Sequence, residues 1–248
     1  MRSKEMLLIG TVHNDPEGFE SLSKVLRENK PVHIAVEVSP YGLSYRNRHG
    51  RLLQAILARR IRRLEKQTRS RLRAESVLRS IREKFRAPFE YRAALRYCRE
   101  SGAALHAIDL SSLSKELIED GWHELIEVEN ITKSINYSSD TKTFSVEQEY
   151  LRAERLLKED SSMVDVFLSP WTSQVIYEER EAHLAGALVD LHSKMEAGCL
   201  VHVGGWQHLL DKGGFKTLFQ RLSHLNPRRL LLPHALKTGT IQRRACWL

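Results

Sequence analysis

The chain has 248 residues and a formal net charge of +8, with 42% hydrophobic and 28% charged residues. This composition excludes a disordered or collagen-like protein and fits one large domain or two small ones. The three cysteines are widely spaced and form no CxxC motif, which excludes a disulfide framework and a cysteine-rich zinc module and favours a reducing compartment.

The first part of the chain predicts a βαβ unit. Residues 5–10 form a short apolar run that ends in glycine, as a buried strand would, and residues 17–28 have helical periodicity. Pro31 ends this helix, and residues 32–38 predict a second strand. Two strands joined in this way lie parallel in one sheet, with a right-handed crossover between them.

The rest of the chain continues with more helix than strand. Residues 43–101 predict basic helices that are interrupted near Pro88, and residues 103–110 predict a third strand. Helical pieces over 112–170, broken near 136–143, precede a long helix at about 174–196. Further strands are predicted at 200–204 and 229–232.

This order predicts an α/β fold: a mostly parallel central sheet flanked by helices, with a long basic helical insertion. We expect a single domain over 1–248, with the insertion at about 43–101 and further helices at about 112–170. The N-terminal apolar run is too short for a signal peptide, and no stretch reaches the roughly 18 apolar residues that a membrane-spanning helix needs. We therefore expect a cytoplasmic protein without a transmembrane segment.

Positive charge is concentrated in one part of the chain. Between Arg46 and Arg86, fifteen lysines and arginines stand against three acids, a local balance of +12. The apolar residues in this stretch have helical spacing, so the arginines would lie on the solvated face, where an anionic or protein partner could bind. No nucleic-acid-binding motif is visible, so we expect no specific nucleic-acid binding, only non-specific attraction to polyanions at low salt. A nucleic-acid-associated protein is a third alternative, which rests on this stretch alone and predicts binding that weakens steeply with salt and does not depend on His13.

Four polar residues follow predicted strands. His13, Glu37, Asp109 and His208 each stand at or just after a strand end, and the carboxyl ends of parallel strands meet at one edge of the sheet. Imidazole and carboxylate ligands suit a divalent metal such as Zn, Mn, Co or Fe, and the same groups can act as general acid or base. Asp109 is followed by serines and is more typical of a helix N-cap.

Two glycines precede the two histidines by three residues, in Gly10-Thr-Val-His13 and Gly205-Trp-Gln-His208. A glycine at a strand end allows a positive φ and a close backbone approach, so we expect Gly10 and Gly205 to shape a cofactor-binding turn. The same GxxH motif follows two apolar strands. This repetition favours a functional site over histidines that only cap the helices after the strands.

These motifs, with Val36-Glu37 and Glu179-Arg180, resemble the TraB/TIKI/ChaN-like superfamily, which includes GumN and the erythromycin-esterase-like proteins. The resemblance runs in order from residue 7 to about 210. It implies an α/β fold with one pocket lined by the GxxH motifs, the glutamate and the arginine. TIKI-like members carry out peptide hydrolysis that depends on Mn or Co, whereas other members bind haem or hydrolyse antibiotic esters.

Carried onto this chain, the resemblance implies that His13 and His208 are metal ligands or acid–base groups and that Glu37 is a ligand or a general base. Arg180 would clamp an anionic group of the substrate or a developing oxyanion. Glu181 stands where the family pattern has asparagine or aspartate, and a leucine replaces the methionine of that pattern. The basic insertion and the lack of a transmembrane tail also set this chain apart from TraB proteins.

Two functions follow from these residues. The first is a metal-dependent hydrolase of a small-molecule or peptide substrate, with a divalent metal (Mn, Co, Fe or Zn) held by His13, Glu37 and His208. The second is a non-enzymatic protein that binds haem, iron or an anionic ligand in the same crevice. Glu37 follows a buried strand and needs a partner, for which Arg180 and a metal are both candidates. The sequence contains no GxSxG motif, so it does not predict a serine nucleophile.

Overall fold

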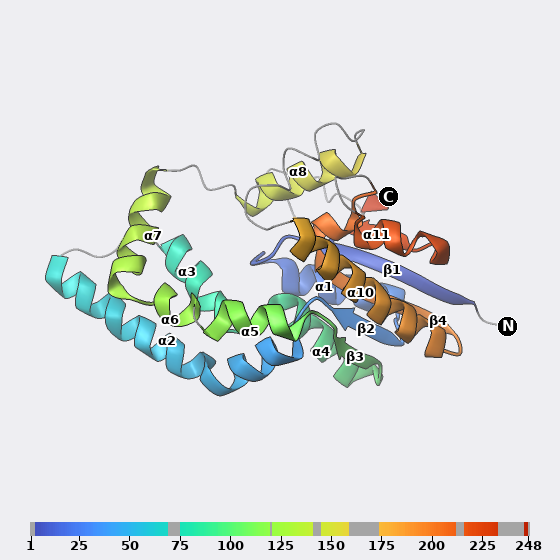
Figure 1. The fold of residues 1–248 in the computed structure, drawn as a ribbon, viewed down its shortest axis with the longest axis horizontal. Helices are drawn as coiled ribbons and strands as arrows, with labels where there is room; N and C mark the ends of the chain where they lie inside the picture. Colours follow the sequence, from blue (N-terminus) through green and yellow to red (C-terminus); the bar gives the residue numbers. More distant parts are fainter. Residues whose placement is uncertain are drawn as a thin grey trace. The chain divides into compact units, whose positions relative to one another are not determined.

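The computed structural model describes residues 3–68, 75–119, 121–140, 145–158, 174–211, 216–232 and 246–247 (Figure 1). The chain forms two compact units. The first unit comprises residues 1–38, 89–109 and 145–248, and the second comprises residues 39–88 and 110–144. The helices expected over 43–101 and over 112–170 are therefore divided between the two units.

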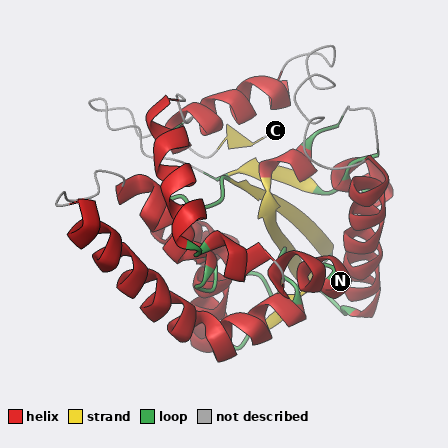
Figure 2. Cartoon of the chain, turned by 60° about the vertical axis from the view of Figure 1, so that its left-hand side comes forward, coloured by secondary structure: helices red, strands yellow, loops and turns green. Residues whose placement is uncertain are grey.

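The first unit contains a six-stranded sheet with the order β3-β2-β4-β1-β5-β6. Figure 2 shows strands of this sheet in yellow among the helices. Its strands are β1 (Lys4–Thr11), β2 (His33–Val36), β3 (Ala104–Ala107), β4 (Gly198–Gly205), β5 (Arg228–Leu231) and β6 (Cys246–Trp247). The first five are parallel, and β6 pairs antiparallel with β5. The predicted α/β class with a mostly parallel sheet is confirmed.

The two central strands are apolar because they are covered on both faces. The last six residues of β1 and of β4 are buried, which is the pattern of a parallel strand inside an α/β sheet. The strands pair in register, so that Gly10 faces Gly204 and Thr11 faces Gly205. This register brings the ends of the two GxxH strands side by side.

The connections leave β1 and β4 in opposite directions across the sheet. The chain passes from β1 to β2 through α1 (Gly18–Asn29) and from β2 on to β3 through α4 (Phe89–Ser101), and these two helices pack together. It returns from β3 to β4 through α10 (Gln174–Lys194) and goes on to β5 through η2 (Trp206–Leu209), α11 (Leu218–Arg221) and η3 (Ser223–Leu225).

Right-handed crossovers then place α1 and α4 on one face and α10 and α11 on the other. The carboxyl ends of β1 and β4 thus form a topological switch point, where open α/β sheets bind ligands.

The second unit is helical within the described residues. It contains α2 (Pro40–Thr68), α3 (Glu75–Lys84), α5 (Ser111–Glu119), α6 (Gly121–Leu125) and α7 (Val128–Asp140). The apolar stripe of α2, formed by Leu53, Leu57, Ile61 and Leu64, is buried in its core. In contrast, α8 (Val146–Lys158) belongs to the first unit. No helix in the described ranges is long and apolar enough to cross a membrane.

Candidate functional site

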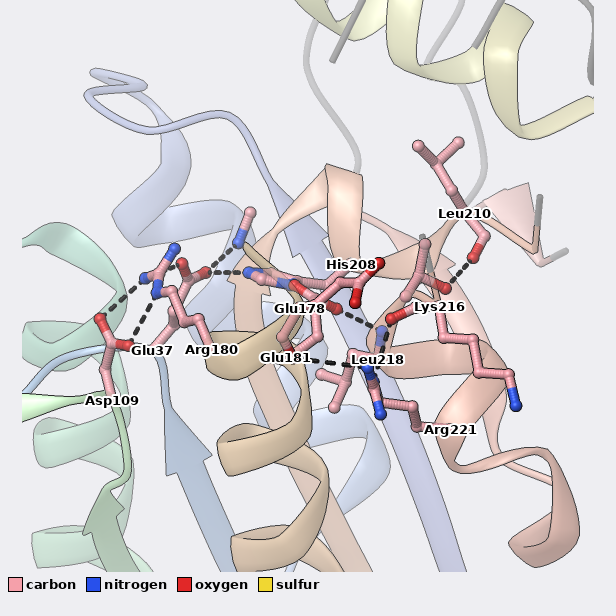
Figure 3. A network of polar contacts seen from close by, with 12 residues as sticks. Glu37, Asp109, Glu178, Arg180, Glu181, His208, Leu210, Lys216, Leu218 and Arg221 are labelled. Atoms are coloured by element: carbon pink, nitrogen blue, oxygen red, sulfur yellow. Dashed lines mark hydrogen bonds and ion pairs between the residues drawn. The ribbon is translucent and has the colours of Figure 1, made fainter. Parts of the chain in front are cut away.

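Three of the four residues predicted at strand ends, Glu37, Asp109 and His208, belong to one chain of ion pairs (Figure 3). Arg180 on α10 lies between Glu37 after β2 and Asp109 after β3. Its Nε donates to Asp109 Oδ1 over 2.8 Å, and its Nη2 donates to Asp109 Oδ2 over 2.7 Å and also to Glu37 Oε1. The partner that Glu37 needs is therefore Arg180, and Asp109 holds the guanidinium fork rather than capping a helix.

The second oxygen of Glu37 continues this chain toward His208. Glu37 Oε2 accepts a hydrogen bond of 2.6 Å from the Gly205 amide and lies 3.0 Å from His208 Nε2. The other ring nitrogen of His208, Nδ1, forms an ion pair of 2.5 Å with Glu181 Oε1. Glu181 is buried, and its second oxygen accepts from the backbone amide at the start of α11. Acidic and basic groups thus alternate from Glu181 through His208, Glu37 and Arg180 to Asp109.

Burial and charge compete in setting the pKa values of this chain. Burial disfavours the ionised form of Glu37, but the charges of His208 and Arg180 outweigh it and hold the pKa of this carboxyl well below its ordinary value. Burial likewise disfavours the imidazolium of His208, but Glu37 and Glu181 outweigh it and raise the pKa of His208 to about 10. Both groups are therefore charged at neutral pH.

His13 forms a separate pair with Glu90, a residue near the start of α4. His13 Nδ1 lies 2.9 Å from Glu90 Oε1, and the Thr11 hydroxyl donates to the same oxygen over 3.0 Å. Glu90 is 3% exposed, whereas the His13 side chain is 56% exposed. Desolvation of the ring opposes protonation, but the hydrogen bond and charge of Glu90 outweigh it and raise the pKa of His13 to about 9.

His13 Nε2 and Glu37 Oε2 lie close together around Gly205 in the second GxxH motif, where a Cβ would also lie 2.9 Å from Gln207 Oε1. A Cβ placed on Gly205 would lie 3.3 Å from His13 Nε2 and 3.6 Å from Glu37 Oε2. The structure therefore brings His13 close to the chain of ion pairs, with Nδ1 bound to Glu90 and Nε2 beside Gly205. A carboxylate on one ring nitrogen fixes the tautomer and leaves the other for chemistry.

The two motif glycines act through close packing. Gly205 has a φ of −59° and Gly10 has no positive φ, so the positive φ expected for them is wrong, whereas the expected close backbone approach is confirmed at Gly10. A Cβ on Gly10 would lie 2.8 Å from Trp206 Cα and 2.6 Å from Leu209 Cδ1. Gly10 thus packs the first motif against the second and contacts its own chain rather than a space for a cofactor.

The predicted metal ligands are engaged with other groups. Glu37 binds Arg180 and His208, and both ring nitrogens of His208 face carboxylates, so a metal would have to displace an arginine and a bound proton. Only His13 Nε2 is directed away from such partners. No group of three or more His, Cys, Asp or Glu side chains within the described ranges is arranged to hold a metal ion. In this arrangement the residues do not fit a metal site made of His13, Glu37 and His208.

Arg180, expected to clamp a substrate anion, already has its charge balanced by two carboxylates. Glu179 and His183, its neighbours on α10, are exposed and lie outside the ion-pair chain.

Sequence reasoning missed Glu90 and Glu181. Glu90 shares the apolar stripe of α4 with Ala93, Ala94 and Tyr97, so a carboxylate at a core position was the signal that could have revealed it. Glu181, read only as a departure from the family pattern, supplies the buried partner of His208.

Comparisons with family models, with curated proteins and with solved structures find no match to this chain.

Proposed function

We propose that the protein is a hydrolase of peptide or ester substrates in which His13 is the proton-transfer group. The observation that carries this proposal is the Glu90–His13 pair: a buried carboxylate binds Nδ1 of a partly exposed imidazole and leaves Nε2 near Glu37. The pair stands at the switch point of the sheet, where the connections after β1 and β4 diverge. The resemblance to the TraB/TIKI/ChaN-like superfamily supports the choice of peptide and ester bonds.

The raised pKa of His13 decides its role. With a pKa of about 9, the imidazole holds a proton on Nε2 at neutral pH and acts as a general acid. Water attacks the carbonyl carbon, the bond to the leaving nitrogen or oxygen breaks, and the proton of His13 passes to that leaving atom. A proton of the attacking water then returns to the imidazole. Glu37 Oε2 lies on the same side of Gly205 as His13 Nε2 and would accept a hydrogen bond from this water.

The chain of ion pairs supports this chemistry because it fixes the position of the Glu37 carboxylate near His13. Arg180 and His208 neutralise Glu37 from two sides, and the Gly205 amide donates a hydrogen bond to Glu37 Oε2. A fixed carboxylate beside the imidazolium favours its charged form and keeps the reacting space polar. Because Glu37 and His208 bind each other and are also paired with Arg180 and Glu181, we expect hydrolysis to persist after treatment with a chelator and to be unchanged by added Mn or Co.

The pH dependence of hydrolysis tests the proposal. A panel of short peptides and esters should reveal a substrate, and its hydrolysis rate should fall as the pH rises above about 9, where His13 loses its proton. In the Glu90→Gln variant the hydrogen-bonding shape is kept but the charge is lost, so the falling limb should move toward the ordinary value of 6.5.

The matched control is Glu100→Gln, an exposed carboxylate on the same helix that pairs with Arg96. It should leave the pH profile unchanged. A falling limb that stays in place in Glu90→Gln, or an inactive wild type across the panel, would contradict the proposal and favour the binding-protein alternative.

A further inference from the structure

The longest helix of the second unit carries a stripe of unbalanced positive charge. Along α2 the exposed residues recur every three or four positions, which places them on one face of the helix. This face, called the basic stripe below, consists of Arg48, Arg51, Arg59, Arg62, Arg63 and Lys66. The opposite face supplies the buried leucines and isoleucine of the unit's core, so the stripe is directed to solvent.

The charges of the stripe have no acidic partner among the described residues. Arg48 and Arg62 donate to carbonyl oxygens one turn earlier in the same helix, which leaves their charge uncompensated. Arg60, which lies beside the stripe, instead donates to the Ile126 carbonyl and to Glu127. Like charges at i,i+3 and i,i+4 spacing repel one another, so an anionic partner would stabilise this surface.

We infer that the basic stripe binds the phosphate backbone of double-stranded nucleic acid without reading its sequence. From Arg48 to Lys66 the stripe extends about 27 Å along a rigid helix, which matches a run of regularly spaced phosphates better than one small anion. Five of its six cations are arginines, whose planar fork binds phosphate oxygens in pairs. The inference concerns a different unit from the proposed active site and does not depend on it.

Two features of the stripe favour a duplex over other polyanions. No aromatic residue stands among the arginines, so the bases of a single strand would find no surface on which to stack. The apolar face of α2 is buried in the core of the unit, and Leu52 is the exposed large hydrophobic residue beside the stripe. The helix therefore cannot insert into a bilayer as an amphipathic anchor does. Contacts with the phosphate backbone of a duplex need neither an aromatic stacking surface nor an exposed apolar face.

Fluorescence anisotropy with labelled 24-base-pair DNA and RNA duplexes tests this inference. Binding should weaken steeply with salt, with a slope in a double logarithmic plot of about −0.9 for each phosphate contacted. The variant Arg51→Gln/Arg59→Gln/Arg62→Gln should weaken duplex binding by about tenfold or more at 100 mM salt and make the slope less negative by about 3. Because glutamine is as good a helix former as arginine and these positions are exposed, the variant should fold normally by circular dichroism.

The control variant removes the same charge elsewhere. Lys24→Gln/Arg27→Gln/Lys30→Gln alters three exposed positions on and just after α1 in the first unit and should keep the wild-type affinity within about twofold. Equal losses in both variants would show attraction by net charge alone and overturn the inference. It would also be overturned by single strands that bind as tightly as duplexes, or by binding to phosphatidylserine vesicles without binding to a duplex.

Discussion

Replacing Arg180 with methionine is expected to lower the free energy of unfolding by about 3–5 kcal/mol. Arg180 binds Asp109 through two hydrogen bonds and neutralises Glu37, whose side chain is only 4% exposed. Methionine has a similar length but no charge, so the substitution leaves two carboxylates together without a cation. Denaturant unfolding followed by circular dichroism measures the loss.

The control for this prediction is Lys194→Met on the same helix. Lys194 pairs with Asp190 at the protein surface, where both side chains are more than half exposed. Such pairs contribute about 0–1 kcal/mol, so the control should remain within that range. Equal stabilities of the Arg180 and Lys194 variants would mean that the chain of ion pairs through Glu37 is not formed in solution.

Replacing His13 with glutamine is expected to reduce the rate of hydrolysis by about 10²–10⁴-fold, the range for the loss of a general acid. Glutamine can still donate a hydrogen bond to Glu90, so the thermal midpoint should change little. It cannot deliver a proton to a leaving group. Steady-state rates on the best substrate of the panel, together with a thermal melt, separate the loss of chemistry from a loss of fold.

His183→Gln serves as the histidine control, because His183 is exposed on α10 and, within the described ranges, forms no hydrogen bond or ion pair with the ion-pair chain. It should retain the full rate. A His13 variant that keeps the wild-type rate would remove His13 from the chemistry and leave the Glu90–His13 pair as a purely structural contact.

The sequence predicted the strands and helices well because their signals are local. The apolar runs at 5–10 and 200–204 became β1 and β4, and the periodic stretch at 174–196 became α10. The placement of β1 between β4 and β5 could not be predicted, since similar apolar runs give no information about which strands are neighbours. The two-residue strand β6, which was not predicted, is too short to leave a pattern.

The candidate site was predicted in part, because the positions of its residues relative to the strands can be recognised in the sequence. His13, Glu37 and His208 stand at strand ends, which a parallel sheet brings to one edge, so their proximity followed from topology. Residue type alone could not distinguish a metal ligand from a member of an ion pair, because that depends on whether Arg180 reaches Glu37. Glu90 and Glu181 were missed because their importance comes from burial, which only the packed structure reveals.

The pKa of His13, measured by NMR titration of its ring nitrogens, tests the central claim most directly and needs no substrate. The His13→Gln variant assigns the signals, and Glu90→Gln reports the contribution of the buried carboxylate. We expect a pKa near 9 in the wild type, with the proton on Nδ1 directed to Glu90, and a lower pKa in Glu90→Gln. A pKa near 6.5 in both proteins would show that Glu90 does not hold His13, and would contradict the proposed role of this pair.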